Sequence, residues 1–327
     1  MRHLLLIGAG FSRNWGGWLA AEVFEYLLGD SVVGSNPRLR ALLWKYQRTT
    51  GFEGALDELQ RTVDGVSRRD ELQLRSAVQR MFETMNFAFK SRGLELGSHT
   101  FDHPIRNFLL RFDAIFSLNQ DLLLEYCYRG SKDGLINIDD ARTERDWVFP
   151  GMQLSSASRE SRTFPSAAGA WVPAEMQVVE GTQPIFKLHG SSNWRTAEGS
   201  DIMILGGGKM RAIAQYPVLQ WYAQLFAEYL NQSESRLMVV GYGFRDEHIN
   251  EVLERAMQNG LQLFIVDPLG AEATSALNTL RPSDPGYKLT PLEEATRGAL
   301  IGASRRTLSS TFSTDEVERR KLDRFFL

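Results

Sequence analysis

Residues 3–12 read HLLLIGAGFS, a short apolar run that ends in two glycines. A run of this kind is typical of a strand that is buried on both faces of a parallel sheet. Gly8 and Gly10 carry no Cβ, so the backbone can turn sharply there and approach a pyrophosphate closely. Arg13 stands where the dinucleotide-binding fingerprint G-x-G-x-x-G has its third glycine. The stretch predicts a first strand followed by either a cofactor-binding turn or an ordinary tight turn.

Strand-like and helix-like segments alternate along the rest of the chain. Apolar runs typical of buried strands occur at residues 113–117, 184–188, 236–240 and 261–266. Apolar residues at helical spacing occur at residues 15–28, 122–128, 216–230 and 246–257, and a terminal helix is expected from residue 314. This alternation predicts an α/β fold with a doubly wound, mostly parallel, Rossmann-like sheet.

The segment between the first two strands is longer than a simple crossover requires. Its predicted helical ranges are residues 38–49, 55–64, 69–90 and 98–110. We therefore expect an inserted helical module over residues 31–105. Residues 130–182 are rich in Ser, Arg, Gly and Pro, which predicts an irregular insertion of loops and short strands. We expect one domain over residues 1–280 and a C-terminal tail over residues 281–327 as a candidate assembly segment.

Composition excludes several classes of protein. The chain has 327 residues, of which 43% are hydrophobic and 24% charged, as is ordinary for globular proteins. Its formal net charge of −3 argues against direct nucleic-acid binding. Cys127 is the only cysteine, which excludes an internal disulfide and a Cys-rich zinc site. The opening apolar run is too short for a membrane span or a signal peptide, so we expect a cytoplasmic protein without membrane contact.

Polar side chains follow two of the predicted strands. Asn119 and Asp121 come after residues 113–117, and His189 comes after residues 184–188. Open α/β sheets bind ligands at the carboxyl ends of their strands, and an imidazole is a natural base for a sugar hydroxyl or a water. Each residue also has a structural interpretation. Asn119 can form a turn, Asp121 can cap the next helix, and His189 can be a packed side chain.

Other candidate patterns do not meet the requirements of known sites. His99 and His103 are four residues apart, but no H-E-x-x-H surrounds them, and we expect no metal site. Residues 206–209 read GGGK, without the spacing of a phosphate loop, and no G-x-S-x-G is present. His248 is expected in the first turn of a helix, outside the strand-end setting of His189.

The three glycine and polar segments together resemble the sirtuin family, which carries a G-A-G-x-S opening loop, an Asn-x-Asp segment and a His-Gly pair. The matching residues are Gly8, Ala9, Gly10, Phe11, Ser12, Asn119, Asp121, His189 and Gly190. The resemblance implies that the opening loop and Asp121 help to bind NAD. It also implies that Asn119 lies near the nicotinamide ribose and that His189 acts as the base at the ribose hydroxyls.

Two later segments look like the adenosine side of the same site. Gly241 and Tyr242 are similar to the glycine loop that contacts the adenine-side ribose in the family. Asp267 ends the last strong strand and is placed to bind the adenosine ribose.

The chain also departs from the protein-deacylating sirtuins. Those proteins have four zinc-binding cysteines and a Gly-Ile-Pro-Asp-Phe-Arg run, where this chain has one cysteine and reads RNWGG at residues 13–17. Residues 187–194 (KLHGSSNW) and 241–250 (GYGFRDEHIN) are instead similar to segments of the sirtuin-like NADases of bacterial anti-phage systems. The resemblance covers most of residues 1–280, which we expect to form a zinc-less, sirtuin-like catalytic domain.

This resemblance implies an NAD+ hydrolase that cleaves the nicotinamide–ribose bond and releases nicotinamide and ADP-ribose. It implies a toxic effector of abortive infection, activated by homo-oligomer assembly or by a partner such as a HerA-type ATPase or an Argonaute-like protein. Two alternatives remain open. One is an NAD-dependent protein deacylase, and the other is a non-catalytic module that senses NAD or ADP-ribose and gates a partner.

Overall fold

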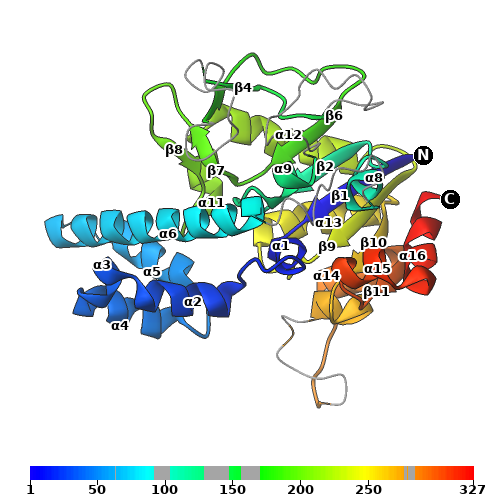
Figure 1. Cartoon of the computed structure of the whole chain (residues 1–327). Coiled ribbons are helices and arrows are strands. Elements are labelled where there is room, and N and C mark those ends of the chain that lie inside the picture. Colours follow the sequence, from blue (N-terminus) through cyan, green and yellow to red (C-terminus); the bar gives the residue numbers. More distant parts are fainter. Residues whose placement is uncertain (63, 92–103, 129–146, 156–169, 276–277, 279–283) are drawn as a thin grey trace.

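A computed structural model of the chain describes residues 1–62, 64–91, 104–128, 147–155, 170–275, 278 and 284–327. Over these ranges the chain forms a seven-stranded sheet with helices on both faces, a four-stranded second sheet and a helical module (Figure 1). The predicted α/β, doubly wound, Rossmann-like fold is confirmed. Within the described ranges, no helix combines the length and the apolar character that a membrane crossing requires.

The strands of the main sheet are parallel, and their order reverses beside the first strand. From edge to edge the order is β11 (Leu300–Ser304), β10 (Gln262–Val266), β9 (Ser235–Val240), β1 (Arg2–Ile7), β2 (Ala114–Ser117), β6 (Gln183–Lys187) and β3 (Trp147–Val148). The chain leaves β1 toward β2 and β6, then crosses back to β9 and continues outward to β11. Such a reversal leaves a crevice at the carboxyl ends of the two strands at the switch, here β1 and β9.

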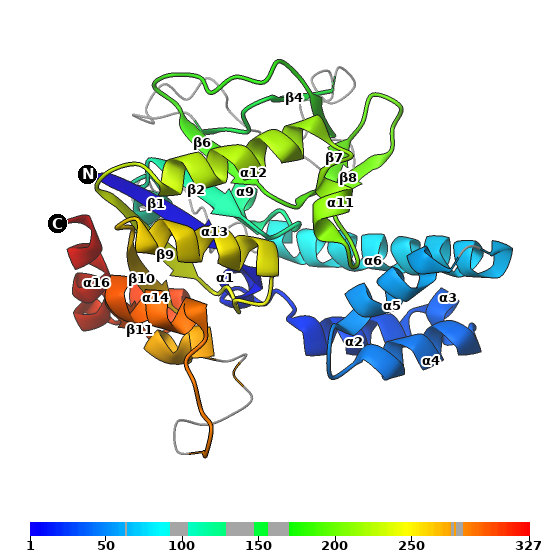
Figure 2. The ribbon, with the colours of Figure 1, turned by 180° about the vertical axis from the view of Figure 1, so that it is seen from behind.

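Helices cover both faces of this sheet, which explains why its inner strands read as unbroken apolar runs. Residues 4–7 of β1 are fully buried, with Leu5 opposite Ile115 of β2 and Met238 of β9. One face carries α12 (Pro217–Leu230), α13 (Glu247–Gln258) and α14 (Pro291–Ala299), as Figure 2 shows. The other face carries α8 (Pro104–Leu109), α15 (Leu308–Ser313), α16 (Glu316–Asp323) and the 3-10 helix η2 (Arg324–Phe326) (Figure 1).

The helical module extends to one side of the main sheet (Figures 1 and 2). It consists of α2 (Ala20–Gly29), α3 (Ser31–Gly34), α4 (Pro37–Tyr46), α5 (Gly51–Arg61) and the long α6 (Gly65–Ser91). Its core holds fully buried side chains such as Leu43, Leu56 and Val78. Asp30 caps α3 through the Val32 N–H and also accepts two hydrogen bonds from Arg80 of α6, both 2.9 Å long. This forked contact fixes α6 against the start of the module.

A second sheet lies beyond the end of β6. Its strands are β4 (Met152–Leu154), β5 (Trp171–Pro173), β7 (Gly190–Arg195) and β8 (Asp201–Met203). Aromatic rings hold it together, since Phe149 packs against both Trp171 and Trp194 with edge-to-face geometry. The sequence predicts only loops and short strands at residues 130–182 and no strand directly after His189. Much of that insertion lies outside the described residues.

Three predicted segments differ in the structure. The helix expected at residues 15–28 begins only at Ala20, as α2, because the chain turns at Gly16, whose φ is +88°; a separate short helix, α1 (Ala9–Arg13), precedes that turn. Of the helix expected at residues 98–110, the described part is α8. Residues assigned to the C-terminal tail supply strand β11 and helices that bury Leu322 and Phe325.

Candidate functional site

Two glycine loops meet where the strand order reverses. Gly8 and Gly10 follow β1, Gly241 follows β9, and the Gly10 N–H donates to the Gly241 carbonyl at 2.8 Å. A Cβ on Gly10 would lie 2.6 Å from the Gly241 Cα, and a Cβ on Gly241 would lie 2.4 Å from the Gly10 Cα. Gly241 also has a φ of +61°, which favours glycine. Both positions therefore require glycine for the two strand ends to approach each other.

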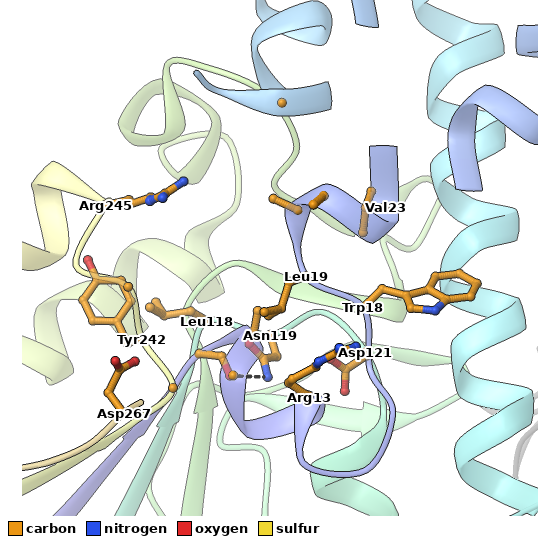
Figure 3. A pocket seen from close by; sticks show the side chains of 18 of the residues that line it. Arg13, Trp18, Leu19, Val23, Leu118, Asn119, Asp121, Tyr242, Arg245 and Asp267 are labelled. Carbon is orange, nitrogen blue, oxygen red and sulfur yellow. Dashed lines mark hydrogen bonds between the residues drawn. The ribbon is translucent and has the colours of Figure 1, made fainter. Parts of the chain in front are cut away.

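A cavity of about 1070 Å³ lies over this crevice, between the sheet and the helical module. Pockets for small molecules and cofactors typically measure about 300–1,000 Å³, so this one accommodates a ligand as large as a dinucleotide. The sequence-predicted residues that line it are Gly8, Ala9, Gly10, Asn119, Asp121, His189, Gly241, Tyr242 and Asp267. In Figure 3, Tyr242 and Asp267 lie on one side of the cavity and Trp18 on the other, with Asn119 between them.

Two residues of the opening loop do not line the cavity. Phe11 is 1% exposed, belongs to the hydrophobic core and packs against the Trp15 ring. Ser12 is also buried, and its hydroxyl bonds to side chains instead of facing the cavity. These two side chains support the loop that the resemblance assigns to ligand binding.

The carboxamide of Asn119 is held in one orientation by this loop. Its Nδ2 donates to the Gly8 carbonyl at 2.9 Å and to the Ser12 hydroxyl at 3.0 Å. The Ser12 hydroxyl donates its own hydrogen to Asp121 Oδ2 at 2.8 Å, so its oxygen is free to accept from Asn119. Both Nδ2 hydrogens are thereby engaged. Over the described residues Asn119 Oδ1 has no hydrogen-bond partner, and it is the atom that can accept from a ligand.

Asp121 joins the loop to α9 (Leu123–Cys127). Its Oδ1 accepts the Leu123 N–H at 3.0 Å, although the N-cap residue of α9 is Leu122, so Asp121 supports the start of the helix from one residue before the expected cap. Burial raises the pKa of the Asp121 carboxyl, and the nearby Lys187 ammonium opposes that rise. Asp121 is thus a buried support that orients Ser12 and, through it, Asn119.

Lys187 lies beneath the site and connects three elements. Its ammonium donates to the Asp121 carbonyl at 2.7 Å and to Glu125 Oε1 and Ser191 Oγ at 2.8 Å each. The Lys187 and Glu125 side chains are only 1% and 2% exposed. Such a pair is tolerated in the interior because all three ammonium hydrogens have acceptors. Lys187 therefore fixes the ends of β6, α9 and β7 relative to one another.

His189 lies between β6 and β7 on the wall of the cavity. It is 4% exposed, and its Nε2 is 3.2 Å from the Nε2 of His248, near the start of α13. Burial, and to a lesser extent the Lys209 ammonium, lower the pKa of His189 to about 3. Burial also lowers the pKa of His248. Both rings are consequently neutral near pH 7.

A partly buried lysine links this pair to the helical module. Lys209 begins α11 (Lys209–Ile213), and its ammonium lies 2.6 Å from Asp246 Oδ1 and 3.2 Å from Glu53 Oε2 of α5. Burial disfavours the ammonium charge, but the two carboxylates outweigh that effect and raise the pKa of Lys209. All three side chains line the cavity. The GGGK stretch thus places a cation between two carboxylates at the junction of sheet and module.

The far end of the cavity is formed by the ends of β10 and β11. Asp267 Oδ1 accepts the Leu269 N–H at 2.9 Å, ahead of the 3-10 helix η1 (Gly270–Ser275). Arg305, Thr307 and Ser309 line the same cavity after β11. Asp267 therefore lies across the cavity from the carboxyl ends of β2 and β6.

The sequence brings out some of these residues and misses others. Asn119 and His189 are predictable because each follows an apolar strand. The sequence places His248 only in the first turn of a helix, although it lies within the stretch GYGFRDEHIN that resembles the sirtuin-like NADases. Glu53 and Lys209 carry no sequence signal, because their pairing depends on how the helical module docks. Among the described residues, no group of three or more His, Cys, Asp or Glu side chains is arranged to hold a metal.

Comparisons with known proteins identify a domain family. The model of the SIR2-like domain matches residues 113–276, half of the chain. A solved structure described as "Structural Basis for the Mechanism and Regulation of Sir2 Enzymes" is 13% identical, with a TM-score of 0.37, over 98% of this chain and 93% of that chain. No curated protein matches the sequence.

Proposed function

This chain belongs to the SIR2-like domain family, and we propose that it is an NAD+ hydrolase that releases nicotinamide and ADP-ribose. One observation carries the proposal. A single cavity of dinucleotide size has Asn119 and His189 in its wall at one end and Asp267 at the other. The family relationship supports NAD as the ligand, and the carboxamide and imidazole supply groups for cleaving it.

The reaction demands little acid catalysis from the protein. The nicotinamide ring nitrogen is cationic in NAD+, so nicotinamide is a good leaving group without protonation. Cleavage of such a glycosidic bond passes through an oxocarbenium-like transition state with positive charge on the ribose. The protein must hold the ribose, position a water and accept a proton.

Asn119 and His189 divide these tasks. Asn119 Oδ1 accepts a hydrogen bond from a ribose hydroxyl or from the attacking water, because its Nδ2 is already bound to Gly8 and Ser12. His189 accepts the proton of the same hydroxyl or water. Its low pKa makes it a weak base, but water that has added to an oxocarbenium ion is strongly acidic. A neutral, weakly basic imidazole is therefore sufficient.

The cations around the cavity fit the pyrophosphate of NAD+. Arg245 and Arg13 line it, Arg13 also pairing with Glu22, and Figure 3 shows Arg245 over the side that carries Tyr242 and Asp267. Lys209 lines it too, but Glu53 and Asp246 already balance its charge. The N–H groups of Gly8, Gly10 and Phe11 already donate to backbone carbonyls. Charge neutralisation of the phosphates therefore falls mainly to the side chains.

Regulation is part of the proposal, because an unrestrained NAD+ hydrolase would deplete its host. We propose a cytoplasmic effector of anti-phage abortive infection that is activated by homo-oligomer assembly, or by a partner such as a HerA-type ATPase or an Argonaute-like protein. The resemblance of residues 187–194 and 241–250 to sirtuin-like NADases supports this role. The exposed Val317 on α16, at 82%, is a candidate contact within the C-terminal segment.

Incubation of the purified chain with NAD+, alone and with each candidate partner, tests the function. The products are resolved by chromatography. Release of equal amounts of nicotinamide and ADP-ribose supports hydrolysis. Nicotinamide release that depends on an acylated peptide would instead identify a deacylase. Saturable NAD+ binding without release in every assembly state would identify a sensing module.

A further inference from the structure

His248 contacts the proposed base directly. The two Nε2 atoms of His189 and His248 are 3.2 Å apart, and the ring centroids are 5.3 Å apart. A neutral imidazole carries a hydrogen on one nitrogen and a lone pair on the other. An Nε2–Nε2 hydrogen bond therefore forms only when one ring bears its hydrogen on Nε2 and the other bears it on Nδ1.

The segment that carries His248 is fixed in place at several points. Asp246, the N-cap residue of α13, is bound by Lys209 at 2.6 Å, and its N–H donates to the Tyr242 hydroxyl at 3.1 Å. The Tyr242 hydroxyl donates to Asn250 Oδ1 at 2.8 Å, and Asn250 Nδ2 donates to the Phe244 carbonyl at 2.6 Å. These bonds clamp the loop before α13 against its first turn. The backbone that presents His248 is accordingly rigid.

The surroundings keep the pair uncharged. Burial is the largest influence on both rings and lowers the pKa of each, and Lys209 lowers both further. Asp246 acts in the opposite direction on the pKa of both rings, Glu251 does so on His248, and a hydrogen bond with the Leu118 backbone does so on His189. A neutral pair attracts through its hydrogen bond, whereas two imidazolium rings at this distance would repel.

We propose that His248 is a positioning residue that fixes the ring orientation and the tautomer of His189 through the Nε2–Nε2 hydrogen bond. This inference rests on the proposed function, because it assigns His189 the role of base. A base is effective only when its lone pair faces the proton that it accepts. By holding Nε2 of His189, His248 fixes the orientation of the ring in the cavity wall, where the Leu118 backbone engages the same ring. The Glu53–Lys209–Asp246 contacts extend this control to the helical module.

Nitrogen NMR of the full chain, labelled with 15N-histidine, tests the hydrogen bond without using activity. The chain has five histidines, so the His189 and His248 signals are assigned from variants that lack each ring. In the wild-type protein we expect one ring with its hydrogen on Nε2 and its partner with hydrogen on Nδ1. In His248→Ala we expect the His189 nitrogens to shift toward a mixture of tautomers. Two wild-type rings with hydrogen on Nδ1, or His189 signals unchanged in His248→Ala, would overturn the inference.

Steady-state kinetics supply the second measurement. For His248→Ala and His248→Gln we expect kcat for NAD+ to fall at least about tenfold, with KM within about twofold of the wild-type value. Glu247→Gln, an exposed change on the same helical turn, is the matched control and should leave both constants unchanged. Unchanged or increased kcat in the His248 variants would overturn the inference. If the wild-type chain releases no nicotinamide, the proposed function fails, while the NMR result still decides the hydrogen bond.

Discussion

The Asn119 carboxamide donates to the Ser12 hydroxyl at 3.0 Å, across 107 residues of sequence. Ser12 lies in α1, which directly follows β1, and Asn119 lies in the loop after β2. Because Ser12 donates in turn to Asp121, the three side chains form a directional chain that leaves Asn119 Oδ1 for the cavity. The opening loop thus contributes to the site by orienting a functional amide as well as by lining the cavity.

Removal of the Asn119 amide should abolish most activity. We expect Asn119→Ala to lower NAD+ turnover by about 10²–10³-fold, because the lost acceptor acts on the developing charge of the ribose. The measurement is nicotinamide release under saturating NAD+. Near-wild-type turnover in a folded Asn119→Ala protein would be incompatible with the proposed role.

Ser12→Ala should have a smaller effect than Asn119→Ala. Asn119 retains its bond to the Gly8 carbonyl, so we expect turnover to fall about tenfold and stability to fall by about 1–3 kcal/mol. Both are measured on the same preparation by nicotinamide release and urea unfolding. A loss of turnover as large as that of Asn119→Ala would show that Ser12 does more than orient the amide.

The glycine loops give a matched pair of stability variants. Gly241→Ala places a Cβ 2.4 Å from Gly10 at a φ of +61°, so we expect a loss of more than about 1 kcal/mol and weaker NAD+ binding. Gly243→Ala meets no atom within 4 Å and should stay close to wild type. Urea unfolding and calorimetric titration with NAD+ compare the two. Equal stability of both variants would contradict the close approach of the loops.

The buried Lys187–Glu125 pair predicts that a second substitution restores stability lost through the first. Lys187→Met leaves Glu125 buried without its cation, which should cost about 3–5 kcal/mol of unfolding free energy. Burial already raises the pKa of Glu125, so the unpaired carboxyl would be neutralised at a higher pH. Lys187→Met combined with Glu125→Leu should recover much of the loss. The account of this pair fails if the double variant is no more stable than Lys187→Met.

His189 predicts a pH dependence of stability. Its pKa in the folded chain is about 3, below the 6.5 of an unfolded chain. Between these pH values the unfolded chain binds a proton that the folded chain does not, so stability falls as pH falls from 6.5 toward 3. The low pKa of His189 should lower the free energy of unfolding by about 2 kcal/mol between pH 7 and pH 5. His189→Gln should therefore lose less unfolding free energy over that interval than wild type, and equal losses would contradict the low pKa.

Much of the fold was predictable because its signals are local. The apolar runs of β1, β2, β6, β9 and β10 are buried on both faces, and each ends near the predicted residue. Strand β11 lies at the sheet edge, where Ile301 is 44% exposed. An edge strand is not buried on both faces, so its sequence, LIGAS, carries no continuous apolar run from which it could be predicted. Strand β7 reads GSSNWR, and its place in the second sheet depends on pairing with distant strands.

The residues of the candidate site could be predicted where they come directly after a strand. Asn119 and His189 both lie on the cavity wall, as expected for residues that follow parallel strands. His248 approaches His189 from a helix that begins 58 residues later, and Glu53 arrives from the inserted module. Contacts of this kind depend on the packing of separate elements, for which no short pattern exists.

A crystal structure of the His189→Ala variant with NAD+ tests the central claim most directly, since slow turnover should preserve the substrate. The proposal predicts the nicotinamide ribose within hydrogen-bonding distance of Asn119 Oδ1, the space left by the imidazole beside it, and the adenosine ribose at Asp267. A dinucleotide bound with its nicotinamide at Asp267, or no dinucleotide in the cavity at saturating NAD+, would contradict it.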